Sequence, residues 1–198
     1  MDLKGSKTAS NLITAFAGEC QAAQRYTLGA KAADKEGFKH IKAVFLETAD
    51  NERTHANTYY KYLRGEEFQL EAIELDAKYG KAFPVVYSDT KTALKGAIDG
   101  ENEEATDMYP EYEKIAREEG FDDIADTFKE ISEVEAHHRD RYQTLLDTLE
   151  ADKMFKKDET TIWKCLNCGY IHEGDTAPEV CPACKHPQGW FMDTNLVK

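Results

Sequence analysis

Two copies of the pattern Glu-x-x-His constrain the fold of this 198-residue chain more than any other feature. The copies are Glu52-Arg-Thr-His55 and Glu135-Ala-His-His138. On a helix, residues three positions apart share a face, so the carboxylate and the imidazole of each copy point to the same side. A single copy is common on a solvated helix and therefore indicates little by itself. The residues around both copies make the pattern informative.

Both copies lie within the apolar stripe of a predicted helix. Around Glu135 and His138, apolar residues recur at intervals of three and four, and the two ionisable residues continue that series. This spacing is typical of the inward-facing seam of a bundle helix rather than of its outer face. We therefore expect ionisable side chains in the interior of a helical bundle. The apolar members of the series are Ile124, Phe128, Ile131, Tyr142, Leu145 and Leu149.

Two pairs of seam carboxylates lie at matching distances from two predicted turns. Glu19 and Glu52 are 33 residues apart around a break near residue 37, and Glu101 and Glu135 are 34 apart around a break near residue 120. Each carboxylate then lies roughly 25 Å along its helix from the turn. Two antiparallel hairpins bring all four to one level, so the sequence predicts a helix–turn–helix unit that occurs twice.

These carboxylates require counter-charge if they are buried. Glu104 follows Glu101 by one turn in the same seam and brings the number to five. Burial of a single unpaired carboxylate costs several kcal/mol. The alternative is that they are solvated charges on amphipathic helices, as expected for most of the 38 acidic residues, but the seam would then have to be wet. A pair of metal ions supplies the charge, and this ligand pattern is typical of ferritin-like carboxylate proteins.

The predicted fold is mainly α: a ferritin-like four-helix bundle over residues 1–151 with a long crossover between its second and third helices. We expect helices over about 6–35, 37–64, 89–118 and 121–151. The crossover, residues 66–88, contains a run at 83–87 typical of an extended or strand-like segment, and Ser88 or Asp89 is the expected cap of the third helix. Pro110 lacks a backbone donor and should kink that helix beyond the level of the carboxylates.

A second chemical centre lies near the carboxyl terminus. Two C-x-x-C pairs, separated by twelve residues, predict a tetrahedral four-thiolate site for zinc or a single iron, and the spacing does not choose between them. Gly169 suits a left-handed turn that lets backbone N–H groups reach sulfur. Such hydrogen bonds raise the reduction potential of an iron–thiolate centre. The four cysteines are Cys165, Cys168, Cys181 and Cys184.

A polar linker is predicted between the two centres. Residues 152–160 would span about 30 Å when fully extended. The small domain, residues 161–198, would then be able to dock away from its own bundle, including on a partner chain.

Composition excludes several function classes. The net charge of −13 and the lack of a basic stripe argue against nucleic-acid binding. No run approaches 18 apolar residues, and the polar start of the chain has no apolar leader segment, so neither membrane insertion nor secretion is expected. Paired cysteines of this kind indicate metal ligation in a reducing compartment, which favours the cytoplasm.

With these motifs on view, the chain resembles the rubrerythrin family over essentially its whole length. The resemblance implies a ferritin-like di-iron domain followed by a rubredoxin-like Fe(Cys)4 domain with short β-strands. It also implies peroxide reduction at the di-iron centre, which is oxo- or hydroxo-bridged when oxidised, with electrons relayed through the rubredoxin-like iron, often across a head-to-tail homodimer. The motifs that carry it are Gly18-Glu19…Arg25-Tyr26, Asn51–Ala56, Gly100–Glu104…Met108-Tyr109-Pro110, Glu135–His138, Trp163–Cys165, Ala177-Pro178 and Cys181–Pro187.

The resemblance also implies a role for each site residue. Glu52 and Glu135 would bridge the irons, and the terminal ligands would be Glu19, Glu101 and His138. His55 and Glu104 would be alternative ligands between which one iron shifts on oxidation. The repeat supports an exceptional role for Glu104, because the matching position after Glu19 is an alanine. Tyr26 and Tyr109 match family tyrosines near the site, although ordinary seam aromatics are an alternative interpretation.

Three positions in or beside these motifs have no settled role. Lys185 stands where simple rubredoxins have glycine, in a turn expected to need positive φ. Cys20 lies off the seam, where we expect an inert buried thiol, and it receives no role. His186 matches a family position between the two centres, and a plain surface histidine is an equal alternative.

The resulting hypothesis is a non-haem di-iron peroxidase that reduces hydrogen peroxide to water in defence against oxidative stress. Electrons would come from NAD(P)H through an external reductase or a rubredoxin-type donor. An iron-oxidising or iron-storing ferritin-like protein is the first alternative, although storage needs no attached electron relay. A non-enzymatic module with a structural zinc ribbon is the second.

Overall fold

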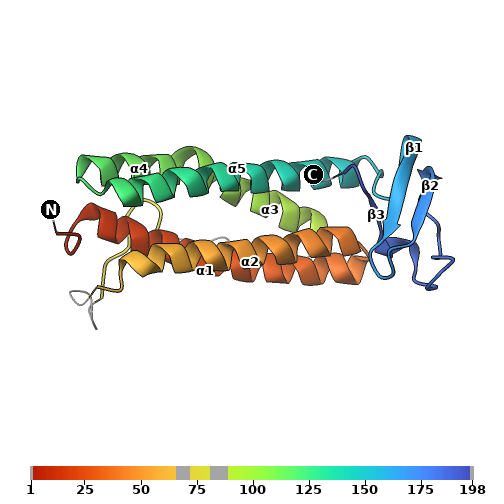
Figure 1. Ribbon diagram of the computed structural model, residues 1–198, viewed down its shortest axis with the longest axis horizontal. Coiled ribbons are helices and arrows are strands. Elements are labelled where there is room, and N and C mark those ends of the chain that lie inside the picture. The colour runs from red at the N-terminus through yellow and green to blue at the C-terminus, as the bar shows by residue number, and fades with distance from the viewer. Residues whose placement is uncertain (1, 66–71, 81–88, 197–198) are drawn as a thin grey trace. The chain divides into compact units, whose positions relative to one another are not determined.

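The computed structural model describes residues 2–65, 72–80 and 89–196. Four helical rods are followed by a small three-stranded sheet (Figure 1), which confirms the predicted ferritin-like bundle with its small four-cysteine domain. The rods are α1 (Lys7–Glu36), α2 (Lys39–Tyr62), α3 (Thr90–Glu103) continued by the π-helix η2 (Glu104–Met108) and α4 (Tyr109–Glu118), and α5 (Asp122–Glu150). Among the described residues, none of these helices is apolar over enough of its length to cross a membrane.

Two glycines end helices where the sequence places the breaks. Gly37 follows α1 with a φ of 87°, and Gly120 follows α4 with a φ of 84°. The next backbone N–H in each case, that of Phe38 or Phe121, donates to a carbonyl five residues back at 2.8 Å. This is the Schellman arrangement, in which a left-handed glycine closes a helix. Tight turns therefore make two antiparallel hairpins, as the spacing of the carboxylates requires.

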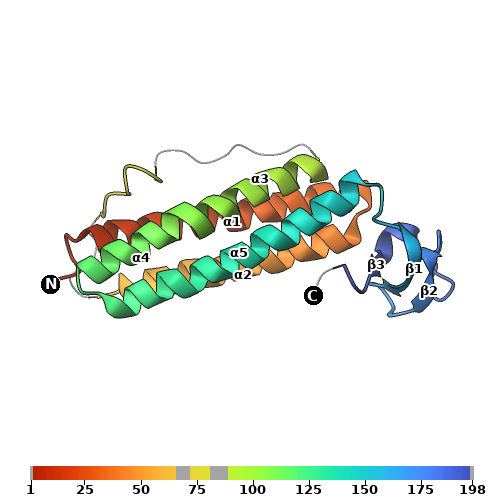
Figure 2. The same cartoon turned by 90° about the horizontal axis from the view of Figure 1, so that it is seen from above.

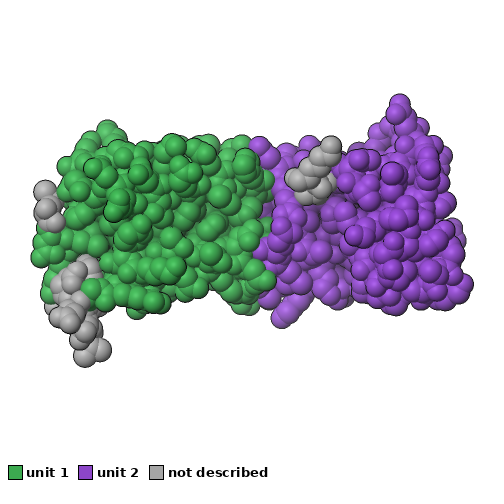
Figure 3. Space-filling model, viewed as in Figure 1, with its two compact units in different colours: residues 1–25, 48–85, 99–139 green, residues 26–47, 86–98, 140–198 purple. Residues whose placement is uncertain are grey.

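The chain forms two compact units (Figure 3). The first comprises residues 1–25, 48–85 and 99–139, and the second comprises residues 26–47, 86–98 and 140–198. Within each unit, segments of all four rods run alongside one another (Figure 2), and the second unit also contains the small sheet. Buried residues of the first unit pack around aromatic rings, among them Tyr59, Tyr109, Tyr112 and Phe128.

The third rod differs from the prediction of a simple kink at Pro110. It changes from α3 into the π-helix η2 at Glu104 and returns to α-helix at Tyr109, so that Pro110 lies in the first turn of α4. A proline ring clashes with the carbonyl four residues earlier and offers no N–H. The wider π-turn accommodates both defects, and such turns are frequent at functional sites. The irregular part of the helix thus begins at the seam carboxylate Glu104, whereas the sequence predicted a kink beyond the level of the carboxylates.

The small sheet has the strand order β2-β1-β3, with both pairings antiparallel (Figure 1). Its strands are β1 (Lys156–Cys165), β2 (Ile171–Thr176) and β3 (Phe191–Asp193), and a short 3-10 turn, η3 (Gln188–Trp190), precedes β3. Trp163 and Phe191 are buried beside Cys165 and Cys181. The cysteines are therefore part of the core of this sheet.

The domain division 1–151, 152–160 and 161–198 stays a prediction, but the linker is shorter than expected. Strand β1 begins at Lys156, so residues 156–160 belong to the sheet. Lys156 pairs with Thr176 of β2, with a register irregularity before Thr161. The polar composition that suggested a linker is that of a largely exposed strand held by its backbone hydrogen bonds.

The segment between α2 and α3 is described in part. The predicted strand-like run at 83–87 and the candidate cap Ser88 lie outside the described residues. Asp89 does cap α3, because its carboxylate accepts a hydrogen bond from the backbone N–H of Thr92 at 2.8 Å. The described turn near Asp76 is tied to α1, since the Asp76 backbone N–H donates to the Thr14 hydroxyl.

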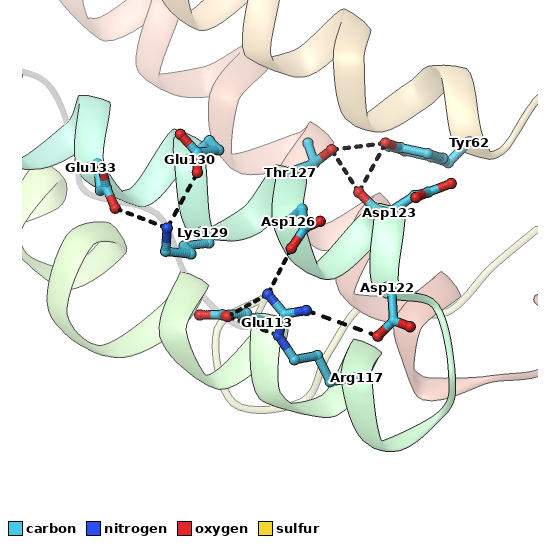
Figure 4. A network of polar contacts seen from close by, with 10 residues as sticks. All are labelled: Tyr62, Glu113, Arg117, Asp122, Asp123, Asp126, Thr127, Lys129, Glu130 and Glu133. Carbon is cyan, nitrogen blue, oxygen red and sulfur yellow. Dashed lines mark hydrogen bonds and ion pairs between the residues drawn. The ribbon is translucent and has the colours of Figure 1, made fainter.

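Most acidic residues are solvated, as expected. On α4 and α5, Arg117 donates to Glu113 and to Asp126, the latter at 2.7 Å, and Lys129 pairs with Glu130 and Glu133 (Figure 4). Exposed ion pairs of this kind contribute little each. The charged residues of this network are exposed or partly exposed and pair with one another at the surface. The carboxylates of the seam differ from them because they are buried.

The buried histidine of α2 makes the stability of the second unit depend on pH. His40 is 6% exposed, and burial, together with the charge of Arg141, lowers its pKa from 6.5 to about 4. Between these pH values the unfolded chain binds a proton that the folded chain does not, so stability falls as the pH falls. The loss is about 3 kcal/mol over this range. We expect a His40→Gln variant to show a flatter melting temperature between pH 6.5 and 4, whereas His137→Gln, at an exposed position of α5, should keep the wild-type slope.

Candidate metal centres

Two groups of ligand-type atoms meet inside the first unit. One group is Glu19, Glu52, His55 and Glu135, and the other is Glu52, Glu101, Glu135 and His138. Within each group the nearest ligand atoms all lie within 4.8 Å of one another. Glu52 and Glu135 belong to both groups, as two bridging carboxylates would. All four rods contribute, which agrees with the level that the spacing from the turns predicts.

The site is almost completely closed to solvent. Glu19, Glu101 and Glu135 are 0% exposed and Glu52 is 1% exposed. Burial and the neighbouring carboxylates raise the pKa of Glu19 well above its usual range. The same causes raise the pKa of Glu104. Several carboxylates therefore repel one another in an interior that is closed to solvent.

The pKa values of the two histidines are raised as well, which favours their charged form. Burial alone would lower the pKa of His55, but the carboxylates of Glu135 and Glu52 outweigh it and raise that pKa to about 9. The pKa of His138 is raised to about 12 by Glu101, Glu135 and Glu52 against the same effect of burial. The site attracts positive charge strongly, and without metal ions it obtains that charge as protons.

The arrangement of the carboxylate oxygens and of the His138 ring nitrogen is suited to metal ions. Buried oxygen atoms of Glu19, Glu52 and Glu135, and Nδ1 of His138, have no hydrogen-bond partner among the described residues. Yet Nδ1 of His138 lies 2.8 Å from Glu135 Oε2 and 3.2 Å from Glu52 Oε1. Atoms so close without hydrogen-bond geometry point at common positions between them. The donor set of carboxylates and imidazoles suits iron or similar divalent ions.

Glu104 lies beside these groups and belongs to neither. It is 8% exposed, it starts the π-helix, and its carboxylate is close enough to Glu101 and Glu135 for their charges to raise its pKa. Gly18 on α1 faces it, since a Cβ there would lie 3.8 Å from Glu104 Oε1. His55, its proposed alternative, is within the first group.

Tyr109, one of the two tyrosines predicted near the site, contacts a seam carboxylate. The Tyr109 hydroxyl donates a short hydrogen bond to Oε1 of Glu19. Tyr26 belongs to the second unit, where its ring packs against Phe45 and Tyr142. The catalytic roles of both stay predictions.

Two further residues of the site were not assigned a role from the sequence. The amide nitrogen Nδ2 of Asn51 lies 3.3 Å from Nε2 of His138. With a metal at Nδ1 the proton sits on Nε2, and an Asn51 amide turned over about its last bond would accept it through oxygen and orient the ring. Arg25 is 5% exposed, and its charge opposes the rise in the pKa of Glu104. Both stand inside the quoted motifs, and their spacing alone does not reveal contacts between rods.

The four cysteines meet at one point in the second unit. Their sulfur atoms lie within 4.8 Å of one another, and the pairs Cys165–Cys184 and Cys168–Cys181 are each 3.7 Å apart. A disulfide would need about 2.05 Å. Tetrahedral bonds of about 2.3 Å to one ion require about 3.8 Å between sulfurs. The spacing is therefore that of a four-thiolate metal site.

The two cysteine turns are built alike. The backbone N–H of Gly169 donates to the carbonyl of Cys165 at 2.8 Å, and that of Lys185 donates to Cys181 at 2.9 Å. Gly169 has a φ of 77° and Lys185 a φ of 63°, so both expectations of a left-handed residue are confirmed. A backbone hydrogen bond from His186 lowers the pKa of the Cys184 thiol to about 5. Cys168 is exposed, whereas Cys165 and Cys181 are buried. The fifth cysteine, Cys20 on α1, is exposed, so the expectation of a buried thiol there is wrong.

Fold and sites together define a class of protein: a ferritin-like bundle with a dinuclear carboxylate site, joined in one chain to a four-thiolate domain. The Rubrerythrin family model matches residues 10–146, and the model "Rubrerythrin, rubredoxin-like domain" matches residues 163–192. The chain belongs to the rubrerythrin family. Its two sites are accordingly the family's di-iron site and its rubredoxin-like Fe(Cys)4 site.

Individual relatives agree over almost the full length. The chain is 51% identical to Rubrerythrin-1 of Clostridium acetobutylicum over 189 residues, covering 96% of this chain and 95% of the relative. It is 43% identical to Rubrerythrin of Nitratidesulfovibrio vulgaris over 190 residues, covering 96% and 95%. The solved structure titled as the fully reduced, all-ferrous state of nigerythrin superposes with a TM-score of 0.63 at 33% identity, covering 96% of this chain and 87% of that one.

Proposed function

We propose that this protein is a non-haem di-iron peroxidase that reduces hydrogen peroxide to water, with electrons supplied through its own rubredoxin-like iron. One observation carries the proposal: two ligand groups that share Glu52 and Glu135 stand in the same chain as a four-thiolate site. A dinuclear site can give up two electrons, which is the number that O–O cleavage requires. A four-thiolate iron delivers electrons singly and so serves as the supply.

The iron pair, when bound, supplies Lewis acidity and two electrons. The residues of the chain do the rest. Glu52 and Glu135 would hold both ions, while Glu19 and Glu101 with His138 would complete the set. The nearly complete burial of this set excludes water, which strengthens every charge interaction in the site.

Protons must reach the peroxide oxygens as the O–O bond breaks. We assign this task to Glu104 and to the pair Tyr109–Glu19. Burial and like charges raise the pKa of Glu104 and of Glu19, and a raised pKa favours the protonated form of each carboxyl group. The Tyr109 hydroxyl fixes the position of the Glu19 carboxylate by donating to it.

Exchange between His55 and Glu104 as ligands is the finer part of the proposal. His55 lies within the first ligand group and Glu104 lies next to it on the π-helix. A carboxylate that enters when the ions gain charge, and an imidazole that leaves, would keep the buried site near neutrality. The wide π-turn gives the Glu104 backbone a position that an α-helix would not.

The reaction is tested by stopped-flow mixing of the fully reduced, iron-loaded protein with one equivalent of hydrogen peroxide. Both centres are followed by absorbance. We expect rapid oxidation of the iron pair, followed by loss of reduced Fe(Cys)4 as electrons pass to it. Peroxide that reacts no faster than with a protein lacking the iron pair would refute a peroxidase.

Glu104→Ala should keep two irons in the bundle but slow peroxide reduction. The residue stands outside both ligand groups, so its loss leaves them complete. Removal of one positioned proton donor typically costs about 10²–10⁴ in rate. The measurement is iron content beside the observed rate constant. Glu103→Ala, at an exposed neighbour on α3, is the matched control, and an unchanged rate in the Glu104 variant would contradict both assigned roles.

A ferroxidase remains the rival function, since ferritin-like bundles also oxidise ferrous iron. The attached four-thiolate site favours the peroxidase. A structural zinc ribbon is tested by metal analysis: three irons per chain and a red oxidised protein are expected, whereas a colourless zinc protein would favour a non-enzymatic module. If a preparation carries zinc in an iron site by mis-metallation, activity after iron reconstitution decides between the enzyme and the non-enzymatic module.

We also propose a head-to-tail homodimer in a reducing cytoplasm, in which electrons pass from the Fe(Cys)4 site of one chain to the iron pair of its partner. An external reductase drawing on NAD(P)H, or a rubredoxin-type protein, would recharge that site twice per turnover. Exposure of Cys168 gives such a donor access to the thiolates. Mixed dimers, in which each chain lacks a different centre, should retain activity.

A further inference from the structure

A row of tyrosine rings leads from the dinuclear site to the surface of the first unit. Tyr109, whose hydroxyl donates to Glu19, has its ring centroid 6.5 Å from that of Tyr112. The centroid of Tyr112 lies 5.6 Å from that of Tyr79. Tyr109 and Tyr112 are 0% exposed, whereas Tyr79 is partly exposed. Three rings thus join a ligand carboxylate to solvent, two from α4 and one from the turn after α2.

Proton acceptors stand at the two ends of the row. A phenol is protonated at neutral pH, because its ordinary pKa is about 10, and it must release this proton when it loses an electron. Tyr109 donates to Glu19, and Tyr79 donates to Glu111 at 3.0 Å. Among the residues described, no carboxylate accepts a hydrogen bond from Tyr112. An oxidised Tyr112 therefore has no hydrogen-bonded carboxylate to take its proton, and the oxidation passes on.

Within the part of the chain that the structure describes, the neighbouring ring of Tyr59 does not offer the same route. Tyr59 lies 5.6 Å from Tyr109 between ring centroids, but it is 0% exposed and packs against Phe128. Oxidation of Tyr59 would stay inside the core. Tyr79 is partly exposed, and its hydroxyl donates to the Glu111 carboxylate, which can accept the proton.

We propose that Tyr109, Tyr112 and Tyr79 form a relay that moves a one-electron oxidation from the dinuclear site to the surface. The relay rests on the proposed peroxide reduction and operates when peroxide meets a site that holds a single reducing electron. Its function is to spare the buried ligands from oxidation during a shortage of donor. When the iron pair is fully reduced, it supplies both electrons itself, and no electron passes through the three tyrosines.

Electrons and protons balance as follows. Hydrogen peroxide takes two electrons and two protons, its O–O bond breaks, and two waters form. One electron comes from the iron pair and the other from Tyr79, through Tyr112 and Tyr109. Tyr79 becomes a neutral phenoxyl radical and its proton passes to Glu111, which offsets one of the two protons consumed; solvent supplies the other. A small thiol then restores the phenol by donating a hydrogen atom.

The test uses the full-length, iron-loaded protein carrying one reducing electron per iron pair. The protein is mixed with one equivalent of hydrogen peroxide without thiol, frozen rapidly and measured by electron paramagnetic resonance. A parallel sample contains a nitroso spin trap, and its adduct is located by mass spectrometry. We expect a tyrosyl signal, altered by ring-deuterated tyrosine, and an adduct on Tyr79. Tyr79→Phe and Tyr112→Phe should both lose the adduct on the peptide containing residue 79.

The matched control is Tyr60→Phe, which alters an exposed tyrosine outside the row and should keep the Tyr79 adduct. An adduct of wild-type yield in Tyr112→Phe would overturn the route through that residue. Consumption of peroxide by the wild-type protein without any tyrosyl signal would overturn the relay while leaving the peroxidase intact. No consumption of peroxide, even by the fully reduced protein, would refute the peroxidase and the relay with it.

Discussion

Glu135→Ala should remove the iron pair from the bundle and leave the Fe(Cys)4 iron in place. Glu135 is 0% exposed and belongs to both ligand groups, so its loss takes one oxygen ligand from each ion at once. We expect iron content to fall from about three to about one per chain, with loss of peroxide reduction. Glu52 is the other shared ligand, and Glu52→Ala should behave in the same way. Metal analysis and the stopped-flow assay measure the two effects.

The same variant should abolish the stabilisation that iron gives the bundle. A ligand present at a thousand times its dissociation constant stabilises the folded state by about 4 kcal/mol. Iron loading should therefore raise the melting temperature of the wild-type protein and have no such effect on Glu135→Ala. The matched control is Glu133→Ala on the same helix, where the side chain is 62% exposed and pairs with Lys129. A Glu135 variant that keeps both irons would show that this carboxylate is no bridging ligand.

The sequence predicted the bundle and the meeting of its carboxylates because both follow from helical geometry. Once Gly37 and Gly120 close the hairpins, the 3.6-residue period and the rise per residue fix which side chains point inward and at what height. The same holds for the cysteine turns, where positive φ at Gly169 and Lys185 is part of the local pattern. Local rules of this kind can be read without knowing what packs against them.

The sequence missed one local feature and two that depend on contacts between distant segments. The π-helix at Glu104 accommodates the clash of Pro110 with the preceding turn, and the pattern of apolar residues does not distinguish it from a kink. The start of β1 at Lys156 depends on pairing with β2, because its polar residues look like a linker. The position of Asn51 beside His138 requires two rods in a particular rotation. In the last two cases tertiary structure decides between locally equivalent choices.

Cys181→Ser should unfold the small sheet and leave the helices intact. The sheet has few residues, and its core consists of Trp163, Phe191 and the buried cysteines themselves. Domains of about 40 residues or fewer usually need a metal or another crosslink. Four-cysteine metal sites of the structural kind contribute on the order of 10 kcal/mol to folding. Loss of one ligand should therefore remove one iron per chain, the red colour and the folded sheet together.

Tryptophan fluorescence isolates this effect, since both tryptophans of the chain, Trp163 and Trp190, lie in the small sheet or beside it. In Cys181→Ser we expect their emission to shift to the red, while the far-ultraviolet circular dichroism stays helical. The matched control is Cys20→Ser, which changes an exposed cysteine of α1 and should leave emission, colour and iron content as they are. Electron delivery should fail even though the iron pair remains, so a single oxidation by peroxide would proceed without further turnover. Continued turnover from the external donor in Cys181→Ser would mean that electrons reach the carboxylate site by a route that does not involve the thiolates.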